Sequence, residues 1–247
     1  VGSEMCIRDS ITTGYNPDQK YLADTWEYDP ETNTWRQMDD FKGGARYYAL
    51  GFGIDNYGYV GTGYNDNYLK DFYRFDPTAA AGSQWTIVNG FGGQKRQGAT
   101  AFVIDGKAYV CGGQNNNSDV SDFWRFDPSA ATPWTQLRDI ANTSDDDYDD
   151  DYTSIVRSYG VSFVIDGKAY LTLGSTAGGS YYSNYWIYDP ETDLWKGDDL
   201  TAFEGSTRIH AVCFSTGTRG IIVTGGSGSS SYFDDTWELK PYEYEEE

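Results

Sequence analysis

The sequence is poor in the residues from which metal sites and nucleophilic sites are built. It has one histidine, His210, and three cysteines, Cys6, Cys111 and Cys213, among 247 residues. The cysteines follow no metal-ligand spacing and suggest no disulfide framework. A single histidine cannot by itself provide a histidine-based metal site or a persuasive catalytic triad. We therefore expect no resident cofactor, and we interpret Cys111 and Cys213 as small buried hydrophobic residues.

Basic residues are also scarce. The chain has 18 Lys and Arg against 38 Asp and Glu, which gives a formal net charge of −20. Proteins that bind nucleic acids or anionic membranes present a basic face to the phosphate groups. The charge therefore argues against both classes of partner. No stretch of the sequence reaches the apolar length that a membrane span requires.

Aromatic residues and glycine are abundant. Aromatic side chains make up 17% of the chain, with 22 Tyr and 8 Trp, and there are 29 glycines. This composition suits twisted sheets and tight turns rather than helices. All eight tryptophans fall inside copies of one recurring pattern, and we expect them to pack between neighbouring sheets. They are Trp26, Trp35, Trp85, Trp124, Trp134, Trp186, Trp195 and Trp237.

The recurring pattern is clearest in Asp122–Trp134, where an aromatic run meets an Asp-Pro pair and a second run begins at a tryptophan. Copies begin at residues 24, 71, 122, 184 and 235, so the spacings are 47, 51, 62 and 51 residues. Proline fixes its own φ angle and favours extended geometry in the residue before it, so each copy predicts a β-hairpin. A period near 50 residues indicates a repeat architecture.

Each repeat predicts four antiparallel strands. In the clearest repeat, Gly98–Ile104 and Lys107–Gly113 are strands joined by Asp105-Gly106, a pair that suits a type I′ turn. The third and fourth strands lie around the two tryptophans of the repeat. One such sheet cannot bury both of its faces, but sheets arranged in a ring bury one another. The sequence therefore predicts an all-β fold, a β-propeller with four-stranded antiparallel blades.

The repeat also resembles the kelch motif. An arginine opens each unit, and a hydrophobic strand, Asp-Gly-Lys-x-Tyr, a glycine doublet, Tyr/Phe-Asp-Pro and Trp follow it. The resemblance extends from Ile11 to about Lys240 and is closest to exported or lipid-anchored kelch proteins of bacteria, within the superfamily of the galactose oxidase central domain. It implies a periplasmic or cell-surface location. The glycine doublet departs from the motif as Gly61-Thr-Gly63 in one repeat and as a lone Gly174 in another.

Five units are visible in the sequence, and three of them are complete. We expect blades at about residues 11–40, 41–90, 91–140, 152–200 and 205–247, with an acidic insertion at 143–152 and a single domain over 11–247. The family resemblance implies a natural ring of six or seven blades.

Val1–Ser10 resembles the in-frame translation of a transposase adapter used in sequencing libraries. We therefore exclude these residues from the fold. We expect the natural gene to be cut near Ile11, so any upstream export signal lies outside the sequence.

The loops between the second and third strands share one end of the propeller with the connections between blades. We call this end the loop face. These loops are rich in Tyr, Asn, Asp and Ser, which provide rigid rings and adaptable polar groups for contact. The candidate contact residues are Tyr64, Tyr68, Tyr181 and Tyr182. The alternative is that these loops are only the polar surface of an exported protein.

Arg46, Arg96, Arg157 and Arg208 each open an innermost strand, so the repeat places them around one end of the central channel. Clustered guanidinium groups would favour a carboxylate or sulfate ligand. The alternative is structural: each arginine binds loop carbonyls and fixes the junction of its blade. Recurrence in every complete blade favours the structural role.

The acidic insertion could supply oxygen ligands to Ca²⁺. Its carboxylates are Asp145, Asp146, Asp147, Asp149, Asp150 and Asp151. The run lacks the spacing and the closing glutamate of a calcium loop, so a solvated, mobile insertion is the favoured interpretation.

These observations favour a non-catalytic kelch propeller that binds a protein, a peptide or a glycan through its loop face. The alternative is a sugar-acting kelch enzyme, similar to the sialic-acid epimerases that act as mutarotases. A copper-radical oxidase similar to galactose oxidase is disfavoured, because that chemistry needs paired histidines and a Tyr-Cys cross-link. A third alternative is a purely structural ring that carries another domain.

Overall fold

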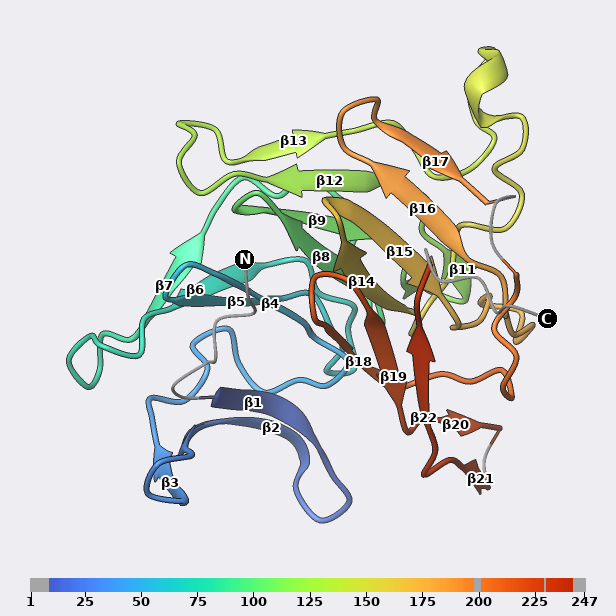
Figure 1. Cartoon of the computed structure of the whole chain (residues 1–247). Coiled ribbons are helices and arrows are strands. Elements are labelled where there is room, and N and C mark those ends of the chain that lie inside the picture. Colours follow the sequence, from blue (N-terminus) through green and yellow to red (C-terminus); the bar gives the residue numbers. More distant parts are fainter. Residues whose placement is uncertain (1–8, 198–200, 229, 242–247) are drawn as a thin grey trace.

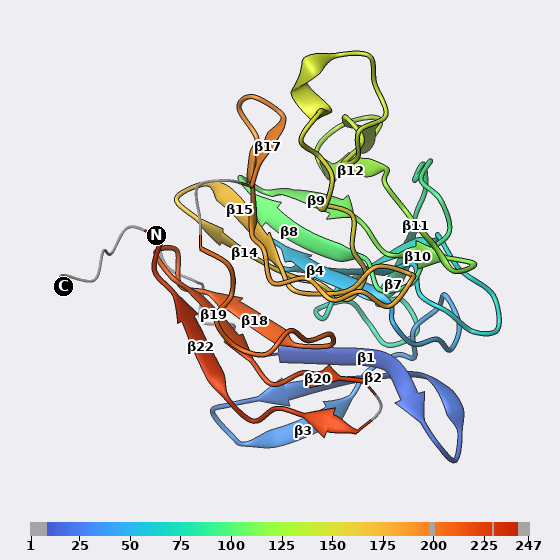
Figure 2. The same cartoon turned by 90° about the vertical axis from the view of Figure 1, so that its right-hand side faces the viewer.

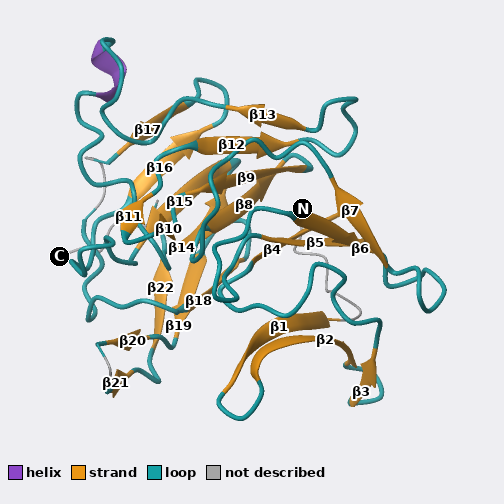
Figure 3. Cartoon of the chain, turned by 180° about the vertical axis from the view of Figure 1, so that it is seen from behind, coloured by secondary structure: helices purple, strands orange, loops and turns teal. Residues whose placement is uncertain are grey.

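The computed structural model describes residues 9–197, 201–228 and 230–241. Nearly all of its regular structure is β-strand, and five antiparallel sheets are arranged as blades around a common axis (Figure 1). A short 3₁₀ turn, η1 (Asp147–Asp149), lies on an outlying loop, as Figure 3 shows from behind. The predicted all-β propeller is therefore confirmed. Within the described ranges, no helix is long and apolar enough to cross a membrane.

Blades 2, 3 and 4 have four strands each, in the order inner to outer. Blade 2 consists of β4 (Leu50–Ile54), β5 (Tyr57–Gly61), β6 (Phe72–Phe75) and β7 (Trp85–Val88). Blade 3 consists of β8 (Thr100–Ile104), β9 (Lys107–Cys111), β12 (Phe123–Phe126) and β13 (Trp134–Gln136). Blade 4 consists of β14 (Val161–Ile165), β15 (Lys168–Thr172), β16 (Trp186–Asp189) and β17 (Leu194–Lys196). The inner strands β4, β8 and β14 lie side by side (Figure 2).

The first and last blades have three described strands each. Blade 1 consists of β1 (Asp9–Asn16), β2 (Lys20–Asp29) and β3 (Thr34–Gln37). Blade 5 consists of β18 (Val212–Ser215), β19 (Gly220–Val223) and β22 (Thr236–Leu239). Two short hairpins lie on the loop face, β10 (Gln114–Asn115) with β11 (Ser118–Asp119), and β20 (Gly226–Ser227) with β21 (Ser231–Tyr232). Of the segment excluded from the fold, residues 1–8 lie outside the described ranges, and Asp9 and Ser10 extend β1.

The inner hairpins follow the predicted turn chemistry. Asp105 and Gly106 have φ angles of 49° and 69°, as the type I′ assignment requires. The predicted strand Gly98–Ile104 begins too early, because Gly98 has a φ angle of 64° and β8 starts only at Thr100. A left-handed residue cannot continue an extended strand, so the chain turns before it enters the sheet.

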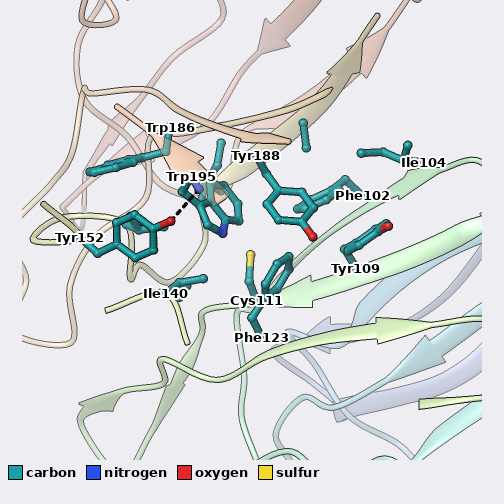
Figure 4. Packing of buried hydrophobic residues seen from close by; sticks show 13 residues of the cluster. Phe102, Ile104, Tyr109, Cys111, Phe123, Ile140, Tyr152, Trp186, Tyr188 and Trp195 are labelled. Atoms are coloured by element: carbon teal, nitrogen blue, oxygen red, sulfur yellow. Dashed lines mark hydrogen bonds between the residues drawn. The ribbon is translucent and has the colours of Figure 1, made fainter. Parts of the chain in front are cut away.

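Four apolar clusters fill the four spaces between consecutive blades. Figure 4 shows the cluster between blades 3 and 4, where Phe123 lies against Tyr188 in an edge-to-face contact with ring centroids 4.9 Å apart. Phe123 also lies 5.6 Å from Trp195. Aromatic pairs in these geometries add to the stabilisation from burial of their surface. Cys111 is buried in the same cluster and Cys213 is half-buried in blade 5, both as free thiols.

Trp35 is the exception to the expected packing of the tryptophans. It is 51% exposed on β3, whereas Trp85, Trp134, Trp186 and Trp195 are buried. The expectation was therefore wrong for Trp35. Trp85, Trp134 and Trp195 also lie on outermost strands, but they pack against the preceding blade. Among the described residues no blade packs against that side of blade 1, and all four residues of β3 are exposed.

The acidic insertion is folded onto the propeller. Asp149 is fully buried, and its carboxylate accepts hydrogen bonds from the backbone N–H groups of Thr143 and Ser144, each at 3.0 Å. These hydrogen bonds hold the pKa of Asp149 below its usual range. Tyr152 is buried between blades 3 and 4, where its hydroxyl accepts a hydrogen bond from the backbone N–H of Trp195 at 2.7 Å. The interpretation as a solvated insertion is therefore wrong for Asp149 and Tyr152. The other aspartates of the insertion are exposed, as that interpretation expects, namely Asp145, Asp146, Asp147, Asp150 and Asp151.

Candidate functional site

The second residue after each buried arginine adopts a left-handed backbone conformation. The φ angles are 52° at Tyr48, 64° at Gly98, 58° at Tyr159 and 57° at His210. This conformation suits glycine but costs other residues on the order of 1–2 kcal/mol, because Cβ approaches the following carbonyl oxygen. Three blades therefore retain a bulky side chain at a position where glycine would be the least strained residue. Such outliers are concentrated at functional sites.

The three side chains meet at the centre of the loop face, although they come from blades 2, 4 and 5. The ring of Tyr48 stacks on His210, with centroids 5.0 Å apart and planes inclined by 10°. The ring centroid of Tyr159 lies 4.5 Å from that of His210 and 4.9 Å from that of Tyr48. We call Tyr48, Tyr159 and His210 the central aromatic cluster. Gly98 makes room for it, because a Cβ atom there would lie 2.5 Å from Cε1 of Tyr159.

Two amide side chains fix the orientation of Tyr159. Its hydroxyl accepts hydrogen bonds from Nε2 of Gln97 at 2.7 Å and from Nε2 of Gln114 at 2.9 Å. Burial raises the pKa of Tyr159 to about 12, so its hydroxyl keeps its proton at neutral pH. Burial also lowers the pKa of His210 below its ordinary value of 6.5. The central aromatic cluster is therefore uncharged at neutral pH.

A pocket of about 530 Å³ opens beside the central aromatic cluster. Four of its described lining residues are aromatic, namely Tyr48 and His210 of the cluster, Tyr232 of β21 and Phe233, which follows β21. Tyr232 is 83% exposed, so its ring is available for contact. Ile209, Thr224 and the glycines of the 225–228 segment complete the wall. Among the described residues that line this pocket, none is Asp, Glu, Lys or Arg.

Further tyrosines extend the central aromatic cluster toward blades 1 and 2. Tyr47 lies 4.4 Å from Tyr48, measured between ring centroids, and stacks on Tyr21 at 5.6 Å with planes 8° apart. Tyr64 lies 5.7 Å from Tyr47 and 5.0 Å from Tyr68. We call Tyr15, Tyr21, Tyr47, Tyr64 and Tyr68 the tyrosine strip. The strip and the cluster form one continuous aromatic surface.

One hydrogen bond fixes the outer end of the tyrosine strip. The Tyr21 hydroxyl donates to Oδ1 of Asp66 at 2.6 Å. This bond is the main reason that the pKa of Tyr21 is raised to about 12. The bond connects the β1–β2 hairpin of blade 1 to the loop between β5 and β6, so the strip bridges two blades.

The four tyrosines predicted from the sequence fall into two groups. Tyr64 and Tyr68 belong to the tyrosine strip. Tyr181 and Tyr182 lie on the blade 4 loop and serve other contacts. The Tyr181 hydroxyl accepts a hydrogen bond from the Gly228 N–H at 2.9 Å, and the Tyr182 ring lies 4.7 Å from the Arg157 guanidinium carbon. The structure therefore brings two of the four predicted tyrosines together.

The four arginines are fully buried and repeat one set of contacts. Arg46, Arg96, Arg157 and Arg208 are at most 1% exposed. In each blade, Nε donates to the carbonyl two residues earlier and Nη1 donates to a carbonyl sixteen residues later. In blades 2, 3 and 5 an aspartate completes the set, namely Asp71, Asp122 and Asp235. This buried position does not suit the ligand role considered for these arginines, and the contacts are those of the structural alternative.

Blade 4 departs from this pattern in charge. The acceptor for Arg157 is Asn184, whose Oδ1 accepts from Nη2 at 3.1 Å while its Nδ2 donates to Oγ of Ser154 at 2.7 Å. Among the described residues no carboxylate forms an ion pair with this buried charge, and burial lowers the pKa of Arg157 to about 10. The guanidinium group donates to carbonyl oxygens of residues 154, 155, 173 and 184 instead.

The aspartates of the insertion do not converge. Asp149 is committed to hydrogen bonds within its own loop. Within the part of the chain that the structure describes, no group of three or more His, Cys, Asp or Glu residues is placed to hold a metal ion. The calcium-ligand role of Asp145, Asp146, Asp147, Asp149, Asp150 and Asp151 stays a prediction without geometric support.

Sequence reasoning missed Tyr48, Tyr159 and the place of His210 in the cluster. A lone histidine argues against a metal site and a triad, but it does not argue against a ring contact. The signal was present two residues after each arginine, where the sequence has Tyr, Gly, Tyr and His in consecutive blades. That position lies at the inner end of each blade, so its side chains meet at the axis.

Two comparisons with known proteins agree with this architecture. The family model described as the kelch motif matches residues 14–42 and 95–137. A solved structure titled "Structure of YjhT" is similar over 95% of this chain and 79% of that chain, with a TM-score of 0.74 and 13% sequence identity. At this level of identity the similarity shows the fold alone. No protein among the curated sequences matches the chain.

Proposed function

Because this chain is a kelch-repeat β-propeller, we propose that it is a non-catalytic binding module whose loop face holds a protein, peptide or glycan ligand. The continuous aromatic surface formed by the central aromatic cluster and the tyrosine strip carries this proposal. Tyrosine rings provide a large contact area at a low cost in conformational entropy, since the side chain has two rotatable angles. A rigid propeller that presents such rings on loops is suited to recognition.

Contacts within the protein hold the rings of the site in place. Hydrogen bonds fix Tyr159 and Tyr21, and ring contacts hold Tyr47 and Tyr48 between them. Side chains that are held in place lose little freedom when a ligand binds, so more of the contact energy contributes to affinity. This pre-organisation supports a binding role.

The alternative is a sugar-acting enzyme, and His210 is the observation that favours it. Its imidazole lines the pocket and is the residue there best suited to exchange a proton near neutral pH. Acid–base chemistry on a sugar would need a second group to work with His210. The pocket wall offers tyrosine hydroxyls, a threonine hydroxyl and backbone groups. This composition favours binding over turnover.

The proposal is tested with peptide and glycan libraries applied to the wild-type protein and to a double variant, Tyr64→Ala with Tyr68→Ala. We expect at least one ligand that the wild-type protein binds and the double variant binds more weakly at an unchanged melting temperature. Absence of any ligand, or binding that is unaffected by changes on the loop face, would contradict the proposal. Conversion of a bound sugar by the wild-type protein would favour the enzyme instead.

A periplasmic or cell-surface location remains a proposal from the family resemblance, and fractionation of a producing cell tests it.

A further inference from the structure

We propose that the pocket beside the central aromatic cluster is the principal subsite for a neutral oligosaccharide, and that the tyrosine strip binds further sugar units. This inference rests on the proposed function and names its ligand. Four observations carry it, namely the charge of the site, the arrangement of its rings, the backbone geometry of three of them and the length of the surface.

The charge of the site excludes strongly charged sugars. The described lining of the pocket contains no acidic or basic side chain apart from the imidazole of His210. The arginines that could hold a carboxylate are buried and already bonded within the protein. A net charge of −20 also disfavours the approach of uronic, sialylated or sulfated glycans. A neutral ligand therefore fits the site best.

The rings provide the contacts that a sugar requires. One face of a pyranose ring presents C–H groups, which pack on an aromatic face, while its hydroxyl groups require polar partners at the edge. The stacked pair of Tyr48 and His210 supplies ring surface, and the exposed ring of Tyr232 lines the same pocket. The Thr224 hydroxyl and the backbone groups of the glycine segment supply the polar edge.

The backbone shows that these rings are retained at a cost. Tyr48, Tyr159 and His210 all adopt left-handed geometry, while blade 3 has glycine at the same position. Glycine would relieve the strain in each case. Thr62, Leu173 and Thr224 also have left-handed geometry at a repeat position, so the strain alone is not the signal. The convergence of three strained side chains on one place is what indicates a function.

The length of the surface indicates more than one sugar unit. The aromatic contacts run from His210 in blade 5 through Tyr48 and Tyr47 to Tyr64 and Tyr68 in blade 2. A monosaccharide would occupy only the pocket. A linear chain of sugars would lie across the strip, so affinity should increase with the number of units.

The experiment measures the binding of defined probes by isothermal titration calorimetry. The probes are linear tetrasaccharides of glucose, mannose, galactose and N-acetylglucosamine, their monosaccharides, and tetragalacturonate as a charged counterpart of the galactose chain. The variants are His210→Ala and Tyr48→Ala, with Trp35→Ala as a control. Trp35 is an exposed aromatic residue on the outer strand of blade 1, away from the cluster.

We expect one of the neutral tetrasaccharides to bind more tightly than its monosaccharide and than tetragalacturonate. Each cluster variant should weaken that binding by about tenfold, and the control should leave it unchanged. Melting curves must show that the variants are folded, and Tyr48→Phe should retain binding because it keeps the ring. A loss in Tyr48→Ala that Tyr48→Phe does not restore would overturn the stacking role.

The remaining outcomes separate this inference from the proposed function. If a neutral glycan binds but depends only on Tyr64 and Tyr68, the principal subsite is wrong and the binding role stands. If only peptides or charged glycans bind to the loop face, the ligand class is wrong and the binding role again stands. If neither these probes nor the peptide and glycan libraries bind, both proposals fail.

Discussion

The packing between blades makes a quantitative prediction, because the repeat places the same residue in different surroundings. Phe102, Phe163 and Phe214 occupy the same position of the inner strand in blades 3, 4 and 5. Phe102 is 4% exposed and Phe163 is 2% exposed, whereas Phe214 is 57% exposed. The first two face the next blade, in the clusters that fill the spaces between sheets. Substitution by alanine should therefore have unequal effects.

The magnitudes follow from the buried area. A fully buried phenylalanine removes about 200 Å² from water, so its loss costs on the order of 3–5 kcal/mol once the cavity is included. Phe163→Ala should fall in this range, since the ring also stacks on Tyr170. Phe214 buries less than half as much surface, and its removal leaves no closed cavity. Phe214→Ala should therefore lower the unfolding free energy by about 1–2 kcal/mol.

Urea unfolding followed by tryptophan fluorescence measures both variants against the wild-type protein. The predicted difference between Phe163→Ala and Phe214→Ala is about 2 kcal/mol in unfolding free energy. Equal losses would show that a further sheet or a second molecule covers Phe214 in solution, and the reasoning from exposure would then be refuted. If the dependence of the unfolding free energy on urea concentration changed in one variant alone, the blades would unfold separately.

Three further predictions concern the blade junctions. Asn184→Asp should raise the unfolding free energy by about 1 kcal/mol, because it gives the uncompensated charge of Arg157 a carboxylate partner; a lower melting temperature would contradict this. The arginine of blade 5 lowers the pKa of Asp235 to about 2, so this aspartate contributes stability above its unfolded pKa of 3.8 that is lost as the pH falls toward 2. Asp235→Asn should therefore destabilise the protein at pH 6 and reduce its acid sensitivity below pH 4, whereas an unchanged acid profile would exclude that role. Gly174→Ala should lower the unfolding free energy by about 2–3 kcal/mol, because the new Cβ would lie 2.6 Å from a backbone carbonyl oxygen. Gly167→Ala should lower it less, because the Cβ there meets open space. Similar melting temperatures for these two variants would contradict the steric argument.

The repeat made the fold predictable from the sequence. The Asp-Pro hairpins, the Asp-Gly turns and the recurring tryptophans are local signals, and each of them corresponds to a strand or turn of a blade. The departures at Gly61-Thr-Gly63 and at Gly174 also have a physical reason. In blades 2 to 5 a Cβ at the second position of the doublet would lie 2.6–3.1 Å from a backbone carbonyl oxygen, and this position is always glycine, whereas blades 2 and 4 carry Thr62 and Leu173 at the first position in left-handed geometry.

The candidate site was less predictable, because its parts are far apart in the sequence. Tyr48, Tyr159 and His210 meet only when three blades close around the axis. No single repeat shows the cluster, and the strand pattern assigned the segment around Gly98 to an extended strand. The anchoring of the acidic loop by Tyr152 was hidden for the same reason, since its partner Trp195 lies in the next blade.

The measurement that tests the central claim most directly is the NMR signal of His210. It is the only histidine of the chain, so its imidazole gives one assignable resonance. On titration with the neutral tetrasaccharide that binds best, we expect this resonance to shift in proportion to occupancy, and the unliganded protein to show a pKa below 6.5. If His210 does not respond while the ligand saturates the protein, the ligand binds elsewhere and the central aromatic cluster is not the recognition site.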